Sequence, residues 1–317
     1  MATNRVQFQA GLSMSEFFER FGTDAQCEQA LAAARWPDGF ACPACSSRQH
    51  SRFRRAGLLY WQCSSCRHQT SVLSGTLFES TKLPLRRWFQ ALYQITHAKN
   101  GISALELMRH LDVSYRSAWL VKHKIMEAMR RREQWRQLEG MVQLDDAYLG
   151  GERCGGRVRD AHTNKVPFVV AVSITPDGHA KHLCLSQQPL KSEELAGFAA
   201  WAISPHATVV SDGMSCFRHV MWIGAVHQSI VTGGGRQAAQ SKEFLAMNTV
   251  LGNLKTSLAG TYHAFAFAKY AQRYFGEIQY RFNRRFNLRS MLERLLRAAA
   301  TTRPCPEHFL RTAEVRA

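Results

Sequence analysis

The sequence has no apolar run of about eighteen residues, and it does not start with a charged segment followed by an apolar core. The first absence argues against a membrane-spanning helix and the second against a secretory signal peptide, so we expect a soluble, intracellular protein with no membrane partner. Acidic residues are also scarce, because 24 Asp and Glu stand against 41 Lys and Arg and leave a formal net charge of +17. This surplus favours a polyanionic partner, and nucleic acid is the first candidate.

Cysteine usage does not favour disulfides, because the total of nine is odd and four of the residues form two Cys-x-x-Cys pairs. Cys42 and Cys45 make the first pair, Cys63 and Cys66 the second, and seventeen residues separate the pairs. This spacing is typical of a zinc ribbon, in which four thiolates close a tetrahedral site and leave no position for a substrate water. We therefore predict a structural Zn²⁺ ion, with two disulfides or a redox pair as the alternatives.

Basic residues suited to phosphate contact surround these cysteines and recur in the helical segment that follows. Residues 102–110, the turn 111–113 and a longer helix over 114–129 have the proportions of a helix-turn-helix. Two packed helices joined by a turn, without any role in DNA binding, are the plainer alternative. From the second helix we predict DNA contacts by Tyr115, Arg116, Lys122 and Lys124.

Two β-branched runs each deliver an aspartate at the end of a strand. The first run, over 142–149, alternates so that Gln143 and Asp145 share one face of the strand. The second run starts at residue 207 and ends in Asp212. Two such carboxylates can hold a divalent metal, although solvated acids at strand ends are the bland alternative.

The segments between these runs predict the fold that joins them. Strands are expected at 166–174 and 181–185 and a helix at 190–203. The order strand, strand, strand, helix, strand matches the start of a ribonuclease H-like fold, whose first and fourth strands lie side by side. We therefore expect an α+β or α/β chain with a mixed sheet in which Asp145 lies next to Asp212.

A third ligand is expected from a following helix, and three residues compete for the role. Asn248 lies two helical turns before Lys255, so the two side chains would share a face. Glu243 is the better ligand chemically, because an anionic oxygen binds a hard cation more strongly than an amide carbonyl does. Asn253 is the remaining candidate. Asn248 can also be read simply as a helix N-cap.

Short motifs are spread over the chain from about residue 17 to residue 286. Besides the ribbon cysteines they are 73–78, 83–85, Trp88 with Phe89, 144–151, 211–213, 248–255, 260–263 and 280–285. Together they resemble a bacterial insertion-sequence transposase family. That family is similar to the wider DDE transposases, in which a zinc ribbon and a helical DNA-binding segment precede a ribonuclease H-like domain whose acids bind two Mg²⁺ ions.

The resemblance implies a role for each residue of the acid site. Asp145 and Asp212 are expected to bind Mg²⁺ or Mn²⁺. In one branch of the family Asn replaces the third acid and is followed by Lys, as Asn248 and Lys255 are here. The commoner pattern has Glu after the first Asp, where this chain has Asp146; we expect Asp146 to face away from the metals and keep it as an alternative ligand.

The resemblance also implies an activity, partners and a domain plan. The expected protein is a DNA transposase of the bacterial cytoplasm that uses two-metal phosphoryl transfer on terminal inverted repeats and target DNA, as a homo-oligomer. A DNA-binding protein without catalysis, either a decayed transposase or a regulator, is the alternative, because the third carboxylate is missing. The expected segments are a helical lead-in (1–37), the zinc ribbon (38–72), a helical DNA-binding segment (73–138), a ribonuclease H-like catalytic domain (139–290) and a basic C-terminal tail (291–317).

Overall fold

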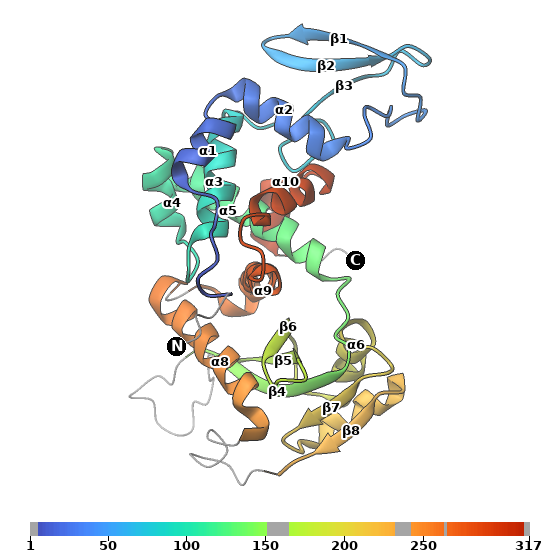
Figure 1. Cartoon of the computed structure of the whole chain (residues 1–317), viewed down its shortest axis with the longest axis vertical. Helices are drawn as coiled ribbons and strands as arrows, with labels where there is room; N and C mark the ends of the chain where they lie inside the picture. Colours follow the sequence, from blue (N-terminus) through green and yellow to red (C-terminus); the bar gives the residue numbers. More distant parts are fainter. Residues whose placement is uncertain (1–5, 151–164, 232–241, 263–264, 314–317) are drawn as a thin grey trace. The chain divides into compact units, whose positions relative to one another are not determined.

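The computed structural model describes residues 6–150, 165–231, 242–262 and 265–313. The chain divides into two compact units, one made of Met1–Met129 with Arg284–Ala317 and the other of Arg130–Asn283 (Figure 1). We call them unit 1 and unit 2. No helix among the described residues is long and apolar enough to cross a membrane. Gly151 and His263, which belong to two of the sequence motifs, lie outside the described residues.

Unit 1 begins with two short helices and a three-stranded antiparallel sheet. Each helix starts at a capping hydroxyl, because Ser13 and Thr23 accept hydrogen bonds from backbone N–H groups of their own first turns. In the sheet His50 pairs with Cys63, so the turn with the first cysteine pair lies against the turn with the second. These elements are α1 (Met14–Phe21), α2 (Asp24–Arg35), β1 (His50–Arg55), β2 (Leu58–Cys63) and β3 (Gln69–Ser71).

The predicted helix, turn and longer helix follow the ribbon. Ser103 caps the first helix by accepting from the Glu106 N–H at 3.0 Å, and Asp112 ends it in the left-handed conformation, with φ 52°. The chain then turns directly into the longer helix. The helices of this part are α3 (Leu85–His97), α4 (Ala104–Leu111) and α5 (Tyr115–Glu133).

The C-terminal segment, which we expected to be a basic tail, contains two helices, α10 (Met291–Thr301) and α11 (Glu307–Thr312). α10 packs against α2 and α3, and its leucines Leu292 and Leu295 are almost fully buried. The segment folds because its apolar residues recur at helical spacing. Its arginines occupy the remaining, exposed positions of the helix, which is why composition alone made it resemble a tail.

Unit 2 is built on a five-stranded mixed sheet with the order β6-β5-β4-β7-β8. β4, the first strand of this unit in the sequence, pairs antiparallel with β5, the second, and parallel with β7, the fourth. This pairing confirms the ribonuclease H-like arrangement expected from the sequence (Figure 1). The fifth strand is parallel to the fourth. The elements are β4 (Met141–Leu149), β5 (Val166–Ile174), β6 (Ala180–Gln187), α6 (Ser192–Ala202), β7 (Thr208–Ser211), η1 (Ser215–Ile223) and β8 (Val226–Ser229).

Each face of this sheet has its own hydrophobic core. Val142 and Leu144 of β4 pack with α6 and η1 on one face. Leu149 lies in the core of the other face, with Ala147 packed against it, beside helices from later in the chain. The alternation predicted for β4 is therefore present, and it decides which side chains of β4 pack against the later helices. The later helices are η2 (Lys242–Phe244), α8 (Leu245–Ser257), η3 (Leu258–Tyr262) and α9 (Phe267–Arg284).

Side chains of α9 cover the free edge of β6. Asn283 accepts a hydrogen bond from the Leu183 N–H at 2.7 Å and donates one to the Leu183 carbonyl at 2.9 Å. Gln279 accepts from the Leu185 N–H at 2.8 Å. Amide side chains thus replace the missing neighbouring strand and close an edge that would otherwise offer unpaired backbone groups.

Two candidate metal centres

The four cysteines of the ribbon come together at the end of its sheet. One ligand atom from each lies within 4.8 Å of all the others. The Cys42 and Cys66 sulfurs are 3.6 Å apart and those of Cys45 and Cys63 are 3.5 Å apart. A disulfide bond is only about 2.0 Å long, whereas sulfurs around a tetrahedral zinc ion lie about 3.8 Å apart. The donor set and its spacing therefore fit a structural zinc ion and not two disulfides.

The four thiols share their protons unequally. A hydrogen bond from the Cys66 backbone N–H lowers the pKa of the Cys63 thiol to about 6, whereas hydrogen bonds with the neighbouring thiols raise the pKa of Cys45 to about 12. The thiolate is the form that binds zinc, so Cys63 is the ligand that its surroundings favour most. The arginines of the ribbon region remain at the surface, and Arg55 lies over the rings of Phe53 and Tyr60 at 5.4 and 5.5 Å.

The second cluster follows from the parallel pairing of β4 with β7. Leu144 pairs with Ser211, so Asp145 and Asp212 are the next residues along two neighbouring strands. Oxygens of these two carboxylates and one of Asp146 all lie within 4.8 Å of one another. The alternation of β4 would point Asp145 and Asp146 to opposite faces, but an oxygen of Asp146 still reaches the other two carboxylates just beyond the last pair of β4 with β7. The structure thus brings the alternative ligand into the group as well.

Burial and mutual repulsion mark this cluster as a place for a cation. Burial raises the pKa of Asp145 to about 6, with the charges of Asp146 and Asp212 adding to the rise and that of Lys255 opposing it. The pKa of Asp146 is raised by burial and by Asp212. Asp212 itself is exposed, so the cluster is open to solvent on one side. Oxygen donors with room for waters are what Mg²⁺ and Mn²⁺ prefer, so these residues fit such an ion.

The candidates for the third ligand lie at and after the start of α8. Glu243 is exposed in η2, Asn248 is half-buried within the first turns of the helix, and Asn253 is exposed further along. Because the helix starts at Leu245 with Phe244 as its N-cap, Asn248 is not an N-cap residue. The choice among the three as a metal ligand stays a prediction. Lys255 is exposed on α8, and its charge is felt at Asp145.

Sequence reasoning missed Gln143, which is almost fully buried two residues before Asp145. Its side chain accepts a hydrogen bond from the Met247 N–H at 3.0 Å and donates one to the Glu243 carbonyl. The signal that could have identified Gln143 is a polar residue on the inner face of a strand, because a buried amide needs a partner for its oxygen and for its nitrogen.

The structure separates the four residues predicted to contact DNA into two pairs. Tyr115 and Arg116 are exposed at the start of α5. Lys122 and Lys124 are buried, and the Lys122 ammonium donates to the Ile102 carbonyl at 2.6 Å. A buried ammonium cannot reach a phosphate, which corrects the prediction for the two lysines, whereas Tyr115 and Arg116 stay predictions. α5 is buried on all sides from residue 121 to residue 129, and this burial is the reason for the difference.

Arg116 is already engaged within unit 1. Its guanidinium donates to both carboxylate oxygens of Glu307 on α11, at 3.2 and 2.9 Å. Arg311 donates to the same carboxylate at 2.7 Å and lies over the ring of Trp119. These two guanidinium groups lower the pKa of Glu307 to about 2, so this carboxylate is ionised at any physiological pH.

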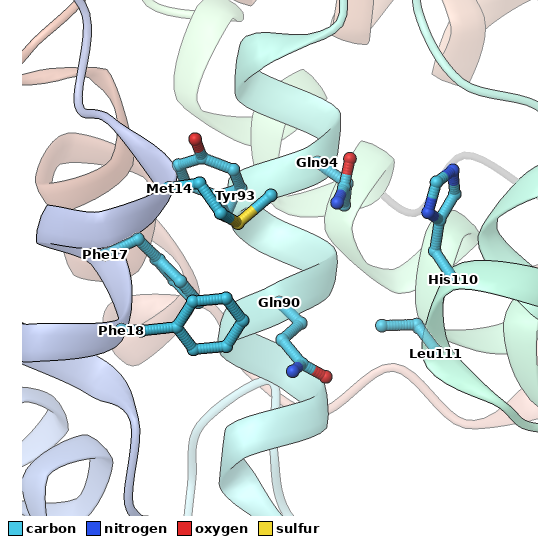
Figure 2. Close-up of a pocket in the computed structure, with 8 residues that line it drawn as sticks. All are labelled: Met14, Phe17, Phe18, Gln90, Tyr93, Gln94, His110 and Leu111. Atoms are coloured by element: carbon cyan, nitrogen blue, oxygen red, sulfur yellow. The ribbon is translucent and has the colours of Figure 1, made fainter.

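Unit 1 also has a small cavity of about 160 Å³ that contains none of the predicted site residues (Figure 2). Figure 2 shows Phe17 and Phe18 of α1 facing Tyr93 of α3 across it, with Leu111 of α4 on the far side. Its lining is mainly apolar, with Gln90, Gln94 and His110 as polar members, and it contains neither a cysteine nor a carboxylate.

Comparisons with known proteins agree with this division of the chain. Residues 22–69 match the family model described as a transposase zinc-ribbon domain, and residues 137–283 match the ISXO2-like transposase domain. A relative from Halobacterium salinarum, described as an uncharacterized protein in transposable element ISH50, is 29% identical over 143 residues. That match includes 44% of this chain and 46% of the relative, so the chain spans less than half of the relative's length.

The two family matches coincide with the two metal centres. The first contains all four ribbon cysteines, and the second contains Asp145, Asp212 and Asn248 with the sheet and helix that carry them. Both models describe parts of insertion-sequence transposases, and they match in the order expected from the motifs. The chain therefore belongs to the insertion-sequence transposase family that carries an N-terminal zinc ribbon.

Proposed function

We propose that this protein cleaves DNA strands at the terminal inverted repeats of its insertion sequence and joins them to target DNA, in a reaction that requires Mg²⁺ or Mn²⁺. The observation that carries the proposal is the convergence of Asp145, Asp146 and Asp212 just beyond the last pair of the neighbouring parallel strands β4 and β7. Membership of the transposase family supports the same activity. The double-stranded DNA partners, action as a homo-oligomer and a bacterial cytoplasmic setting are parts of this proposal.

Each residue of the acid site has a task in this proposal. Asp145 and Asp212 hold the metals from two strands whose separation is fixed by backbone hydrogen bonds. Bound metals would supply a Lewis acid that activates the attacking water or 3′-hydroxyl and stabilises the leaving oxygen. Asn248 offers a neutral oxygen from α8, so the site carries less negative charge than one with a third carboxylate at that position. Lys255 supplies a positive charge that can hold a phosphate of the scissile strand.

The zinc ribbon and the start of α5 are proposed to hold the DNA. The ribbon arginines are exposed, as are Tyr115 and Arg116, and each can contact phosphates. A net charge of +17 supports a DNA partner, because each neutralised phosphate releases counterions on binding. These contacts position the substrate and are separate from the chemistry at the carboxylates.

A transposition assay with a donor plasmid that carries the gene's own flanking DNA tests the proposal. We expect the wild type to produce insertions and Asp145→Asn and Asp212→Asn each to reduce them about a thousandfold, because each substitution keeps the shape and removes a metal-binding charge. Asp177→Asn, an exposed turn residue of unit 2, is the matched control and should behave like the wild type. Glu243→Gln, Asp146→Asn and Asn248→Ala then identify the third ligand.

The second candidate is a DNA-binding protein without catalysis, which the amide at position 248 favours. Under this alternative the wild type binds its terminal DNA with or without divalent metal but yields no insertions. Asp145→Asn would then change no measurable activity. Insertions by the wild type that disappear in Asp145→Asn exclude this alternative.

A further inference from the structure

The start of α8 lacks a capping group of its own. Phe244 is its N-cap residue and has no side chain that accepts a hydrogen bond from the first turn. The first N–H groups of a helix have no partner within the helix, so they need an acceptor from elsewhere. α8 also carries Asn248 and Lys255, so the way in which its first turn is held decides where these two side chains lie.

Gln143 supplies the missing acceptor from the neighbouring strand. Its Oε1 accepts from the N–H of Met247, the third residue of the helix, at 3.0 Å. A capping side chain at the N-cap position makes this same bond to the second or third N–H of its helix. The Nε2 of Gln143 donates to the carbonyl of Glu243, just before the helix. One amide therefore holds both a donor and an acceptor of the helix start, because it carries an NH₂ donor and a carbonyl acceptor side by side.

The position of Gln143 ties this cap to the acid site. It lies two residues before Asp145 on β4, on the same face of the strand, and it is 5% exposed. Met247, which it holds, directly precedes Asn248. The strand that carries the first carboxylate and the helix turn that carries the amide are thus joined through one buried side chain.

We propose that Gln143 is a positioning residue for the carboxylate site, which fixes the first turn of α8 on β4 and thereby sets Asn248 and Lys255 relative to Asp145. The proposal rests on the proposed function of that site as a metal centre. It makes no claim that Gln143 touches metal or DNA. A residue that only stabilised the fold would affect unfolding without affecting the affinity of the site for metal.

Binding of Mn²⁺ to the zinc-loaded full chain tests this inference without requiring catalysis. Free Mn²⁺ gives an electron paramagnetic resonance signal that is lost on binding, so titration measures the affinity directly. The wild type should bind Mn²⁺, and Asp145→Asn should lose that binding. Gln143→Met keeps the volume of the side chain but makes neither hydrogen bond, and it should weaken Mn²⁺ binding at least fivefold. Gln143→Asn keeps both groups on a shorter stem that cannot reach both partners, and it should give a smaller loss.

The control is Ser13→Ala, which removes a hydroxyl cap from α1 in unit 1. It should lower the melting temperature by a similar amount and leave Mn²⁺ affinity unchanged. Unchanged Mn²⁺ affinity in folded Gln143→Met overturns the inference, as does a wild type that binds no Mn²⁺. If Gln143→Met does not fold, Gln143→Asn decides between the same two results. A wild type that binds Mn²⁺ through Asp145 but joins no strands sinks the proposed function and leaves the role of Gln143 standing.

Discussion

The two candidate metal centres of this chain are assembled in opposite ways. The four thiolates come from residues 42–66, a stretch so short that two turns and a hairpin bring them together. The carboxylates of Asp145 and Asp212 are sixty-seven positions apart and meet only because β4 and β7 are neighbours in the sheet. The first centre depends on local chain geometry and the second on the topology of a whole unit.

The centres differ as much in what they can do. Four thiolates fill the coordination of zinc and leave it no position for a substrate, so the ribbon centre serves structure. The carboxylate cluster has an exposed side at Asp212, so it has room for waters and substrate oxygens beside a cation. The pKa of Asp145 in this cluster is raised. The proposed function places DNA holding in unit 1 and chemistry in unit 2, and each part of it can be tested separately.

The largest effect is expected from loss of the ribbon zinc. Cys63→Ser should unfold the ribbon, because zinc binding to such small domains contributes about 10–16 kcal/mol of folding free energy. Binding of terminal DNA should fall at least about a hundredfold as its arginines lose their arrangement. Gel-shift titration and zinc analysis measure both results.

Mn²⁺ binding by unit 2 should survive the same substitution. The matched control is Cys184→Ser, a buried thiol of unit 2 that belongs to neither metal cluster. Full DNA binding by a zinc-free Cys63→Ser variant would break the division between the two centres.

A smaller effect is expected on the melting temperature when Mn²⁺ is added, and its size should depend on pH. At pH 7.5 and at a concentration 100-fold above Kd, Mn²⁺ should stabilise the protein by about 2.7 kcal/mol and raise the melting temperature by roughly 5 °C. Asp145 has a pKa of about 6, so protons compete with the metal below that value and the rise should largely vanish at pH 5. Thermal melts with and without Mn²⁺ at both pH values check this, and an equal rise at both would contradict it.

Removing one charge from the metal-free acid cluster should stabilise it. A folded pKa raised above the ordinary value of 3.8 means that ionised Asp145 costs stability at pH values above about 6, and that this cost disappears below 3.8. Metal-free Asp145→Asn should therefore be more stable than the wild type by about 1–3 kcal/mol at pH 7.5 and by much less at pH 4. Urea denaturation at the two pH values measures the difference. Loss of stability in Asp145→Asn at pH 7.5 would show that burial of the ionised carboxylate, with the repulsion from Asp146 and Asp212, does not cost the metal-free protein stability.

The contrast between the centres also explains what the sequence could predict. Cys-x-x-Cys spacing encodes a local geometry, so the ribbon could be predicted without knowing any fold. Asp145 beside Asp212 required a correct strand order, which the alternation of strands and a helix supplied. The partners of Gln143 at 243 and 247 could not be predicted, because they are set by how α8 packs on the sheet.

Charge was the least reliable guide to position. Lys122 and Lys124 were counted as surface groups because of their charge, but α5 is enclosed there and Lys122 finds a carbonyl inside unit 1. The arginines of α10 likewise hid the buried leucines between them. Composition indicated a polyanionic partner, whereas which basic residues reach the surface depends on packing that the sequence does not state.

The smallest predicted effect asks whether the DNA-holding surface of unit 1 extends beyond the ribbon to α5. Glu307 binds both sides of the Arg116 guanidinium fork, so in the free protein this arginine is paired with a carboxylate. Glu307→Gln should free it for a phosphate, raise the affinity for terminal DNA about two- to fivefold and make log Kd about one unit steeper against log salt. The matched control is Glu293→Gln. Glu293 lies on α10 and pairs with Arg20 of α1, so this substitution removes an equal charge elsewhere in unit 1. If both variants gain equally, net charge alone explains the effect and this surface is not part of the DNA site; if only Glu307→Gln gains, recognition in unit 1 includes the surface formed by Arg116 of α5 and Arg311 of α11, the two arginines that Glu307 holds.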